Sequence, residues 1–452
     1  MRTRGALPLL VALLLVLAGC GGLGADRAEA RTGFADEPVG PLTTMGYSLP
    51  DEVARVRVER FRQRYPAVDL RLNEGAFDEQ QFLSALASGR PPDLVYLDRA
   101  DLPSFAARGA LLPLDECFEV TGMDLAEFRP AAAAQVRYQN RPYGVPEFLI
   151  VRLLMANRVA LADAGIDPSR VDTADWGRLE AWARAMTRSS GSRLARLGVD
   201  PKIPDFFPMW VRAAGGDVLS ADGRTARLDS PQAVEVLEMA KRIVDQAGGQ
   251  GVVQAFRDGW DLFGARNPFA ADQIGLSPME DWYLNVLAQN SPRAPVVVLP
   301  FVGRDHQPLS WATGLAWAIP QGARNRAAAC RLVREMTTPD AWVAAATAKR
   351  DARLARGLHY TGTYTAHVAA DERIRAEVLR PTGLDWLDEG IRVIERAQGV
   401  AFALPASPAG AEVKRAWEDA VTRALGGRAS PADALREAQQ RATAALARVG
   451  AR

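Results

Sequence analysis

The chain has 452 residues, a formal net charge of +1 at pH 7, 48% hydrophobic residues and 24% charged residues. Its length exceeds that of one ordinary domain and predicts two lobes with separate cores. The near-neutral charge provides no basic field, so a nucleic-acid partner is not expected. His306, His359 and His367 lack metal-ligand spacing, so no metal or other cofactor is expected.

The N-terminus has the pattern of an exported lipoprotein. Arg2 and Arg4 precede the apolar run 6–19, which has the length of a signal peptide and is short for a membrane span. The run ends in Leu-Ala-Gly-Cys at 17–20, which resembles a bacterial lipobox. In a lipobox the cysteine, here Cys20, receives a diacylglycerol that anchors the mature protein. The alternative is a plain secretory signal with a chance cysteine.

The expected body of the protein follows this signal. Residues 1–20 are interpreted as a lipoprotein signal peptide with a lipobox, and 21–39 are small, polar and without a pattern, which favours a flexible tether. No later segment is apolar enough to span a bilayer. We therefore expect a protein lipid-anchored at the outer face of the cytoplasmic membrane. That setting permits a disulfide between Cys117 and Cys330, with two separate buried thiols as the alternative.

Strand and helix patterns alternate from residue 41 onward. They predict strands at 41–49, 68–74 and 93–98, and helices at 50–65, 77–89 and 100–109. The strand at 93–98 is a continuous apolar run, which is typical of a parallel strand buried on both faces. The order indicates an α/β lobe with a parallel sheet, where ligands bind outside the carboxyl ends of the strands.

Asp98 stands at one such strand end. Its carboxylate is expected to accept hydrogen bonds from a ligand, and the alternative is an N-cap for a helix that begins at Ala100. Asp101 fits the first turn of that helix and could share both roles. Farther along the chain, helices are predicted at 175–188, 230–246 and 430–449, the second with Ser230 as its cap and Pro231 in its first turn.

Several blocks, in order from about residue 50 to 449, resemble the extracellular solute-binding proteins of ABC importers, the family-1 or maltose-binding-like group. The blocks are VERFRQRYPAVDLRL (58–72), the segment 84–116 with PPDLVYLD, YGVPEFLIVRLLMAN with its continuation (143–168), the segment 207–244 with its Trp, Gly-Gly and Ser-Pro, FAADQIGLSPMEDW (269–282), and the segment 296–340. No one block is highly specific, but the ordered set is.

The resemblance implies a two-lobed periplasmic-binding-protein-like (type II) α/β fold, with a mainly parallel sheet in each lobe and a hinge between the lobes. It divides the chain into an N-terminal lobe of 40–147 plus 267–314 and a C-terminal lobe of 148–266 plus 315–450. It also implies a monomeric, non-enzymatic receptor that clamps a sugar in the cleft by hinge closure and hands it to the ABC permease subunits.

Sugar recognition needs carboxylates and amides for hydroxyls, and aromatic rings for the apolar sugar face. The resulting ligand-binding candidates are Tyr47, Asp98, Glu147, Arg152, Trp210, Trp282, Trp311, Thr313, Gly314 and Trp386. Leu149 and Ile150 stand where polar residues are common in the family, which predicts a more apolar wall. The alternatives are core filling for each tryptophan and a structural ion pair for Arg152.

Three other functions stay open from the sequence. An exported glycosidase would use paired carboxylates, but no nucleophile elbow, zinc motif or phosphate loop is present. A sensory lipoprotein would keep the two-lobe body without an importer. A receptor for a phosphorylated ligand, such as a glycerophosphodiester, would use Arg99 and Arg152.

Overall fold

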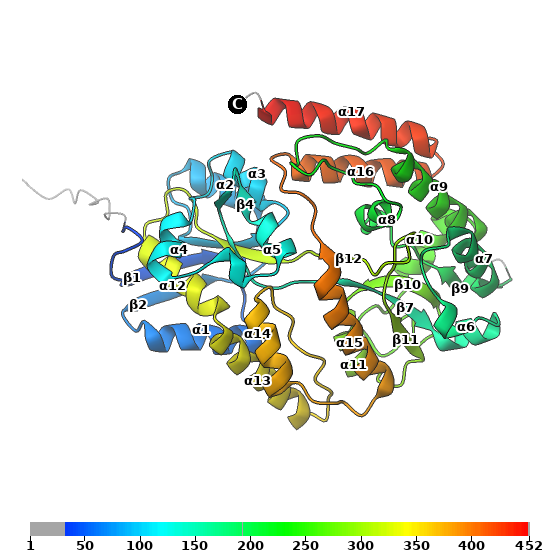
Figure 1. The fold of residues 1–452 in the computed structure, drawn as a ribbon, viewed down its shortest axis with the longest axis horizontal. Helices are drawn as coiled ribbons and strands as arrows, with labels where there is room; N and C mark the ends of the chain where they lie inside the picture. Colours follow the sequence, from blue (N-terminus) through cyan, green and yellow to red (C-terminus); the bar gives the residue numbers. More distant parts are fainter. Residues whose placement is uncertain (1–31, 192, 451–452) are drawn as a thin grey trace, which may run out of the picture.

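The computed structural model describes residues 32–191 and 193–450, which form two lobes side by side (Figure 1). The predicted signal peptide, Cys20 and residues 21–31 of the expected tether lie outside the described residues. Within the described ranges, no helix is both long and apolar enough to cross a membrane.

The first lobe is built on a five-stranded sheet. Its strand order is β2 (Val68–Asn73), β1 (Gly40–Met45), β3 (Leu94–Asp98), β13 (Leu315–Ala318) and β6 (Val145–Pro146). β1 is parallel to β2 and β3, whereas β13 runs antiparallel to β3 and β6. The helices of this lobe are α1 (Glu52–Arg64), α2 (Glu79–Ala87), α3 (Leu102–Ala107), α4 (Asp115–Thr121), α5 (Pro130–Gln135), α12 (Arg326–Thr337), α13 (Pro339–Ala355) and α14 (Val368–Arg373). A small hairpin, β4 (Arg137–Tyr138) and β5 (Arg141–Pro142), lies beside them.

The second lobe has its own five-stranded sheet. The order is β11 (Val296–Leu299), β7 (Arg152–Asn157), β10 (Ile274–Glu280), β9 (Arg193–Val199) and β8 (Arg188–Ser190). Its helices are α6 (Arg158–Asp163), α7 (Trp176–Met186), α8 (Phe207–Ala213), α9 (Pro231–Gln246), α10 (Gln250–Asp258), α11 (Tyr283–Asn290), α15 (Asp385–Val400), α16 (Gly410–Leu425) and α17 (Pro431–Gly450). Among the described residues of this sheet, only β9 and β10 pair in parallel, so the expectation of a mainly parallel sheet is wrong for this lobe.

The chain passes between the lobes three times, from β6 to β7, from β11 to β13 and from α14 to α15 (Figure 1). Near the second and third passages, β12 (Ser310–Trp311) pairs in parallel with β14 (Ala401–Phe402). This short ribbon places Trp311 between the two sheets.

The two sheets correct the expected assignment of the later chain segments to the two lobes. Residues 267–314 contain β10 and β11, which belong to the second sheet rather than to the first lobe. Residues from 315 onward begin with β13, which enters the first sheet, and are followed by α12 and α13, which pack beside α1. Strand pairing across hundreds of residues leaves no local pattern in the sequence, so the lobe of each returning segment could not be read from periodicity.

The described end of the expected tether is also different from a flexible linker. Phe34 is only 5% exposed and belongs to the hydrophobic core. The backbone N–H of Thr32 donates to the carbonyl of Arg324 at 2.9 Å, and the Asn325 side chain donates to the carbonyl of Val39 at 2.9 Å. Residues 32–39 are therefore packed against the first lobe, because one aromatic anchor and a capping amide hold an otherwise polar segment.

Other local predictions agree with the structure. The predicted helices at 50–65, 77–89 and 230–246 correspond to α1, α2 and α9, and Ser230 accepts a capping bond from the Ala233 N–H at 3.3 Å. Cys117 of α4 and Cys330 of α12 form a disulfide, which settles the alternative that the sequence left open.

Candidate functional site

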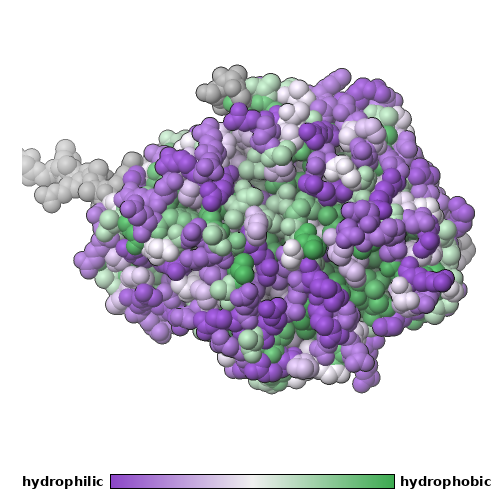
Figure 2. Space-filling model, viewed as in Figure 1, coloured by the Kyte–Doolittle hydropathy of each residue, from purple (hydrophilic) through white to green (hydrophobic). Residues whose placement is uncertain are grey.

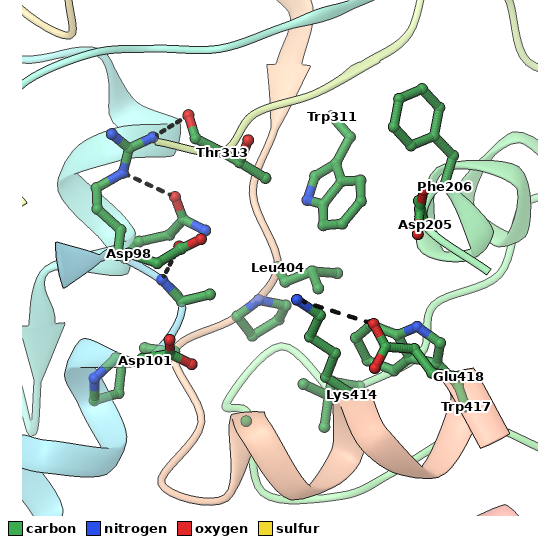
Figure 3. Close-up of a pocket in the computed structure, with 18 of the residues that line it drawn as sticks. Asp98, Asp101, Asp205, Phe206, Trp311, Thr313, Leu404, Lys414, Trp417 and Glu418 are labelled. Atoms are coloured by element: carbon green, nitrogen blue, oxygen red, sulfur yellow. Dashed lines mark hydrogen bonds and ion pairs between the residues drawn. The ribbon is translucent and has the colours of Figure 1, made fainter. Parts of the chain in front are cut away.

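A cavity of about 250 Å³ lies between the lobes, and its lining comes from both of them. On the face of the molecule that Figure 2 shows, apolar residues gather along the middle, between hydrophilic flanks. The first lobe contributes Asp98, Arg99, Ala100, Asp101, Pro103 and Gln135, and the second lobe contributes Arg152, Asp205, Phe206, Leu219, Glu280, Gly410, Lys414, Trp417 and Glu418. Trp311, Thr313 and residues 404–406 of the connecting segments complete it (Figure 3).

Asp98 reaches the cavity because it is the last residue of β3. Its Oδ1 accepts a hydrogen bond from the Ala100 N–H at 2.9 Å, which closes the turn after the strand. Helix α3 begins later, at Leu102, so Asp98 does not cap it. Asp101 occupies the position before the helix without making a capping bond, and its burial together with the Asp98 charge raises the pKa of Asp101 to about 6.

Arg99 is buried behind this turn and holds it against the interlobe segments. Its guanidinium donates to the carbonyls of Phe148, Thr313 and Leu315, the last two at 2.6 and 3.3 Å, and its Nε donates to Gln135 Oε1 at 3.1 Å. Burial lowers the pKa of Arg99 to about 10. These bonds fix the hinge side of the cavity and leave Arg99 poorly placed to receive an anion.

Arg152 at the start of β7 supports the aromatic floor of the cavity. Its Nη1 donates to the Trp311 carbonyl at 3.0 Å and to Thr313 Oγ1 at 2.7 Å. Its guanidinium carbon lies 4.6 Å from the centroid of the Trp311 ring and 5.2 Å from that of Phe206. Burial lowers the pKa of Arg152. The arginine therefore orients the tryptophan by cation–π contact and by hydrogen bonds to its carbonyl and to Thr313.

Helix α16 forms the opposite wall, and sequence reasoning missed it. Lys414, Trp417 and Glu418 line the cavity from this helix, with Lys414 Nζ 3.9 Å from Glu418 Oε1 (Figure 3). Residues 404–406 lead into the helix and line the same wall. None of the blocks that carried the family resemblance included this segment. The sequence did offer one signal for this wall, which is Trp417 with the charged residues Lys414 and Glu418 close to it.

Four of the predicted ligand-binding residues meet at this cavity: Asp98, Arg152, Trp311 and Thr313. Three others are enclosed in the cores. Tyr47 packs against Tyr96 and Trp317, Glu147 pairs with Arg57, and Trp210 is buried with its Nε1 donating to the Pro201 carbonyl at 2.8 Å. Their side chains contact other core residues or the backbone instead of lining the cleft.

The last three predicted residues also lie outside the cavity lining. Trp282 stacks at the surface on Phe263, and the Trp386 indole donates to the Pro292 carbonyl at 3.1 Å. Gly314 has a φ of +146° and lies against Arg99. Its role is to allow the close approach of the two segments, because a side chain there would overlap the arginine.

The two sheets, the three connections and the interlobe cavity define a two-lobed binding protein. Residues 40–341 match the model of the bacterial extracellular solute-binding protein family, and the chain belongs to this family. The fold is shared with CpMnBP1 with mannobiose bound, at a TM-score of 0.72 and 22% identity over 89% of this chain and 99% of that one. It is also shared with an ABC substrate-binding protein of Listeria monocytogenes in complex with cycloalternan, at a TM-score of 0.71 and 16% identity over 90% and 99% of the chains.

A curated relative is the diacetylchitobiose binding protein DasA of Streptomyces coelicolor. It is 26% identical over 157 residues, which are 34% of this chain and 36% of the relative. The aligned part thus spans well under half the length of that protein.

Proposed function

We propose that this chain is a membrane-tethered receptor that binds a carbohydrate between its lobes and delivers it to the permease of an ABC importer. The observation that carries the proposal is the cavity itself, where Asp98 of the first lobe lies across from Trp311 and the α16 wall. A carboxylate for hydroxyls and an aromatic ring for a sugar face are the two elements of sugar recognition. The relatives named above bind or contain mannobiose, cycloalternan and diacetylchitobiose.

Membership of a binding-protein family supports recognition without reaction, and so supports a receptor over a glycosidase. For a phosphorylated ligand, Arg99 is not available, because it is committed to three backbone carbonyls and to Gln135. The lipid anchor on Cys20, the monomeric state and the location outside the cytoplasmic membrane are parts of the same proposal. Metabolic labelling with a fatty acid, with Cys20→Ser as the comparison, tests the anchor.

Calorimetric titration with a panel of oligosaccharides tests carbohydrate binding. We expect one or more sugars to bind, and Trp311→Ala to weaken that binding by at least tenfold, because the variant removes the ring that lines the cavity. Trp282→Ala is the matched control, since it removes a surface tryptophan outside the cavity and should leave affinity unchanged. Binding of peptides or amino acids with no response to any sugar would overturn the carbohydrate class.

A further inference from the structure

We propose that the preferred ligand of this cleft carries a positively charged amine, as an amino sugar does. This inference rests on the proposed carbohydrate-receptor function and names the ligand class more closely. It follows from the charges that line the cavity and from how each of them is already engaged within the protein.

Carboxylates reach the cavity from both lobes. Asp98 and Asp101 come from the first lobe, and Asp205 and Glu418 come from the second (Figure 3). Glu280 of the second lobe also lines the cavity. Glu280 is neutralised by Lys202, whose Nζ lies 2.6 Å from its Oε2. Within the described ranges, Asp98, Asp101 and Asp205 make no ion pair. A ligand in the cavity therefore meets three carboxylates that have no direct ion-pair partner among the described residues.

The cations that line the cavity offset these carboxylates only in part. Arg99, Arg152 and Lys414 attract them through space without pairing with Asp98, Asp101 or Asp205, and the lining holds five carboxylates against these three cations. Arg99 is buried and donates to carbonyls and to Gln135. Arg152 is buried and donates through Nη1 to carbonyls and to Thr313, while its Nε has no hydrogen-bond partner among the described residues. Lys414 is the lysine that lines the cavity, and it lies beside Glu418. Burial and, to a smaller extent, the Asp98 charge raise the pKa of Asp101 to about 6, against the opposing effect of Lys414.

A neutral sugar would give these carboxylates hydroxyl hydrogen bonds but no positive charge, and burial of a charge without a counter-charge is costly. An ammonium group would form charge-assisted hydrogen bonds with them. The aromatic rings of Trp311, Phe206 and Trp417 also line the cavity and offer a surface to the apolar face of a sugar ring.

The Trp311 indole adds a requirement for an acceptor oxygen on the ligand. Trp311 is 8% exposed, and its buried Nε1 has no hydrogen-bond partner among the described residues. In Figure 3 this nitrogen is on the side of the ring that faces Asp98. A buried donor without a partner costs stability until a ligand satisfies it. A sugar hydroxyl together with an amine matches both the indole donor and the carboxylates.

The test is a calorimetric comparison of the purified full-length protein with oligosaccharides of several linkages, each supplied in its hydroxyl form and in its 2-amino form. We expect the amino form to bind at least tenfold more tightly than the matched hydroxyl form, with an affinity that falls as salt is added. Asp98→Asn and Asp205→Asn should each reduce this preference severalfold. Asp69→Asn, at an exposed carboxylate on β2, is the control and should leave the preference intact.

The outcomes separate this inference from the proposed function. Equal or tighter binding of the hydroxyl forms overturns the amine and leaves the carbohydrate receptor standing. Binding of no sugar in either form overturns both. An amine preference that survives both aspartate variants would also overturn the assignment, because the carboxylates would then not be its cause.

Discussion

Arg57 and Glu147 form an ion pair inside the first lobe, with Arg57 Nη2 2.6 Å from Glu147 Oε1 and side chains only 1% and 0% exposed. Arg57 also donates to the Met336 carbonyl at 3.0 Å and to the Tyr47 hydroxyl at 3.2 Å, and its guanidinium lies 3.9 Å from the Trp342 ring centroid. The pair thus joins α1, the first interlobe passage and the α12–α13 region. Glu147 therefore pairs with Arg57 inside the lobe, whereas the sequence predicted that it would contact a ligand.

Glu147→Ala is expected to destabilise the protein by about 3–5 kcal/mol, because it leaves the Arg57 guanidinium buried without a counter-charge. Urea unfolding followed by circular dichroism measures this loss. The control is Asp69→Ala, which breaks an exposed pair with Arg71 and should cost less than about 1 kcal/mol. A Glu147 variant with normal stability and lost sugar affinity would contradict the structural role.

Gly314→Ala is expected to destabilise the interlobe region by about 1–3 kcal/mol more than the same change at Gly75. Both glycines have similar left-handed φ angles, +146° and +139°, so the backbone cost of alanine is shared. A Cβ at Gly314 would overlap the Phe148 carbonyl and the Arg99 guanidinium, whereas at Gly75 it meets nothing within 4 Å. Thermal unfolding of the two variants measures the difference, and equal melting temperatures would refute the overlap.

Removal of the Cys117–Cys330 disulfide is expected to lower stability by about 2–5 kcal/mol, since it closes a loop with a sequence separation of 213. The double variant Cys117→Ser with Cys330→Ser, unfolded in urea beside the wild type, measures the cost. Because both cysteines lie in helices of the first lobe, sugar affinity should persist in folded protein. A free-thiol assay that finds both thiols unblocked in the oxidised wild type would contradict the bridge.

Much of the fold could be predicted because its elements are encoded locally. The apolar run 93–98 became β3, and its end carried Asp98 to the cavity as expected. Ser230 and Pro231 marked the start of α9. These signals depend on residues within one turn or one strand, where periodicity and capping preferences act.

The site could be predicted only in part because burial depends on distant partners. Trp210 and Trp311 both looked like cleft aromatics, yet one donates its indole N–H to the Pro201 carbonyl in the core and the other lies between the sheets. Glu147 looked accessible because Arg57, its partner, is 90 residues away in the sequence. The α16 wall was missed for the same reason, since only the folded chain brings it across from Asp98.

Asp281 lies at the joint between β10 and the first interlobe passage. Its backbone N–H donates to the Val151 carbonyl at 2.9 Å, and its Oδ2 accepts from the Val151 N–H at 3.0 Å. Burial raises the pKa of Asp281 to about 7, against the opposing effect of that backbone bond and of the Arg152 charge, while Glu280 adds to the rise.

Because an unfolded aspartate has a pKa of about 3.9, the folded protein binds an extra proton at Asp281 between about pH 4 and pH 7. This residue should therefore contribute about 2 kcal/mol more stability at pH 5.5 than at pH 8, and the contribution is lost as the pH rises through 7. Asp281→Asn keeps an oxygen to accept from the Val151 N–H and removes the titration. Urea unfolding measures the free energy of unfolding of both proteins at the two pH values. The value of the variant minus that of the wild type should be about 2 kcal/mol larger at pH 8 than at pH 5.5. A stability difference that is independent of pH would contradict the raised pKa, because the substitution would then remove no proton linkage.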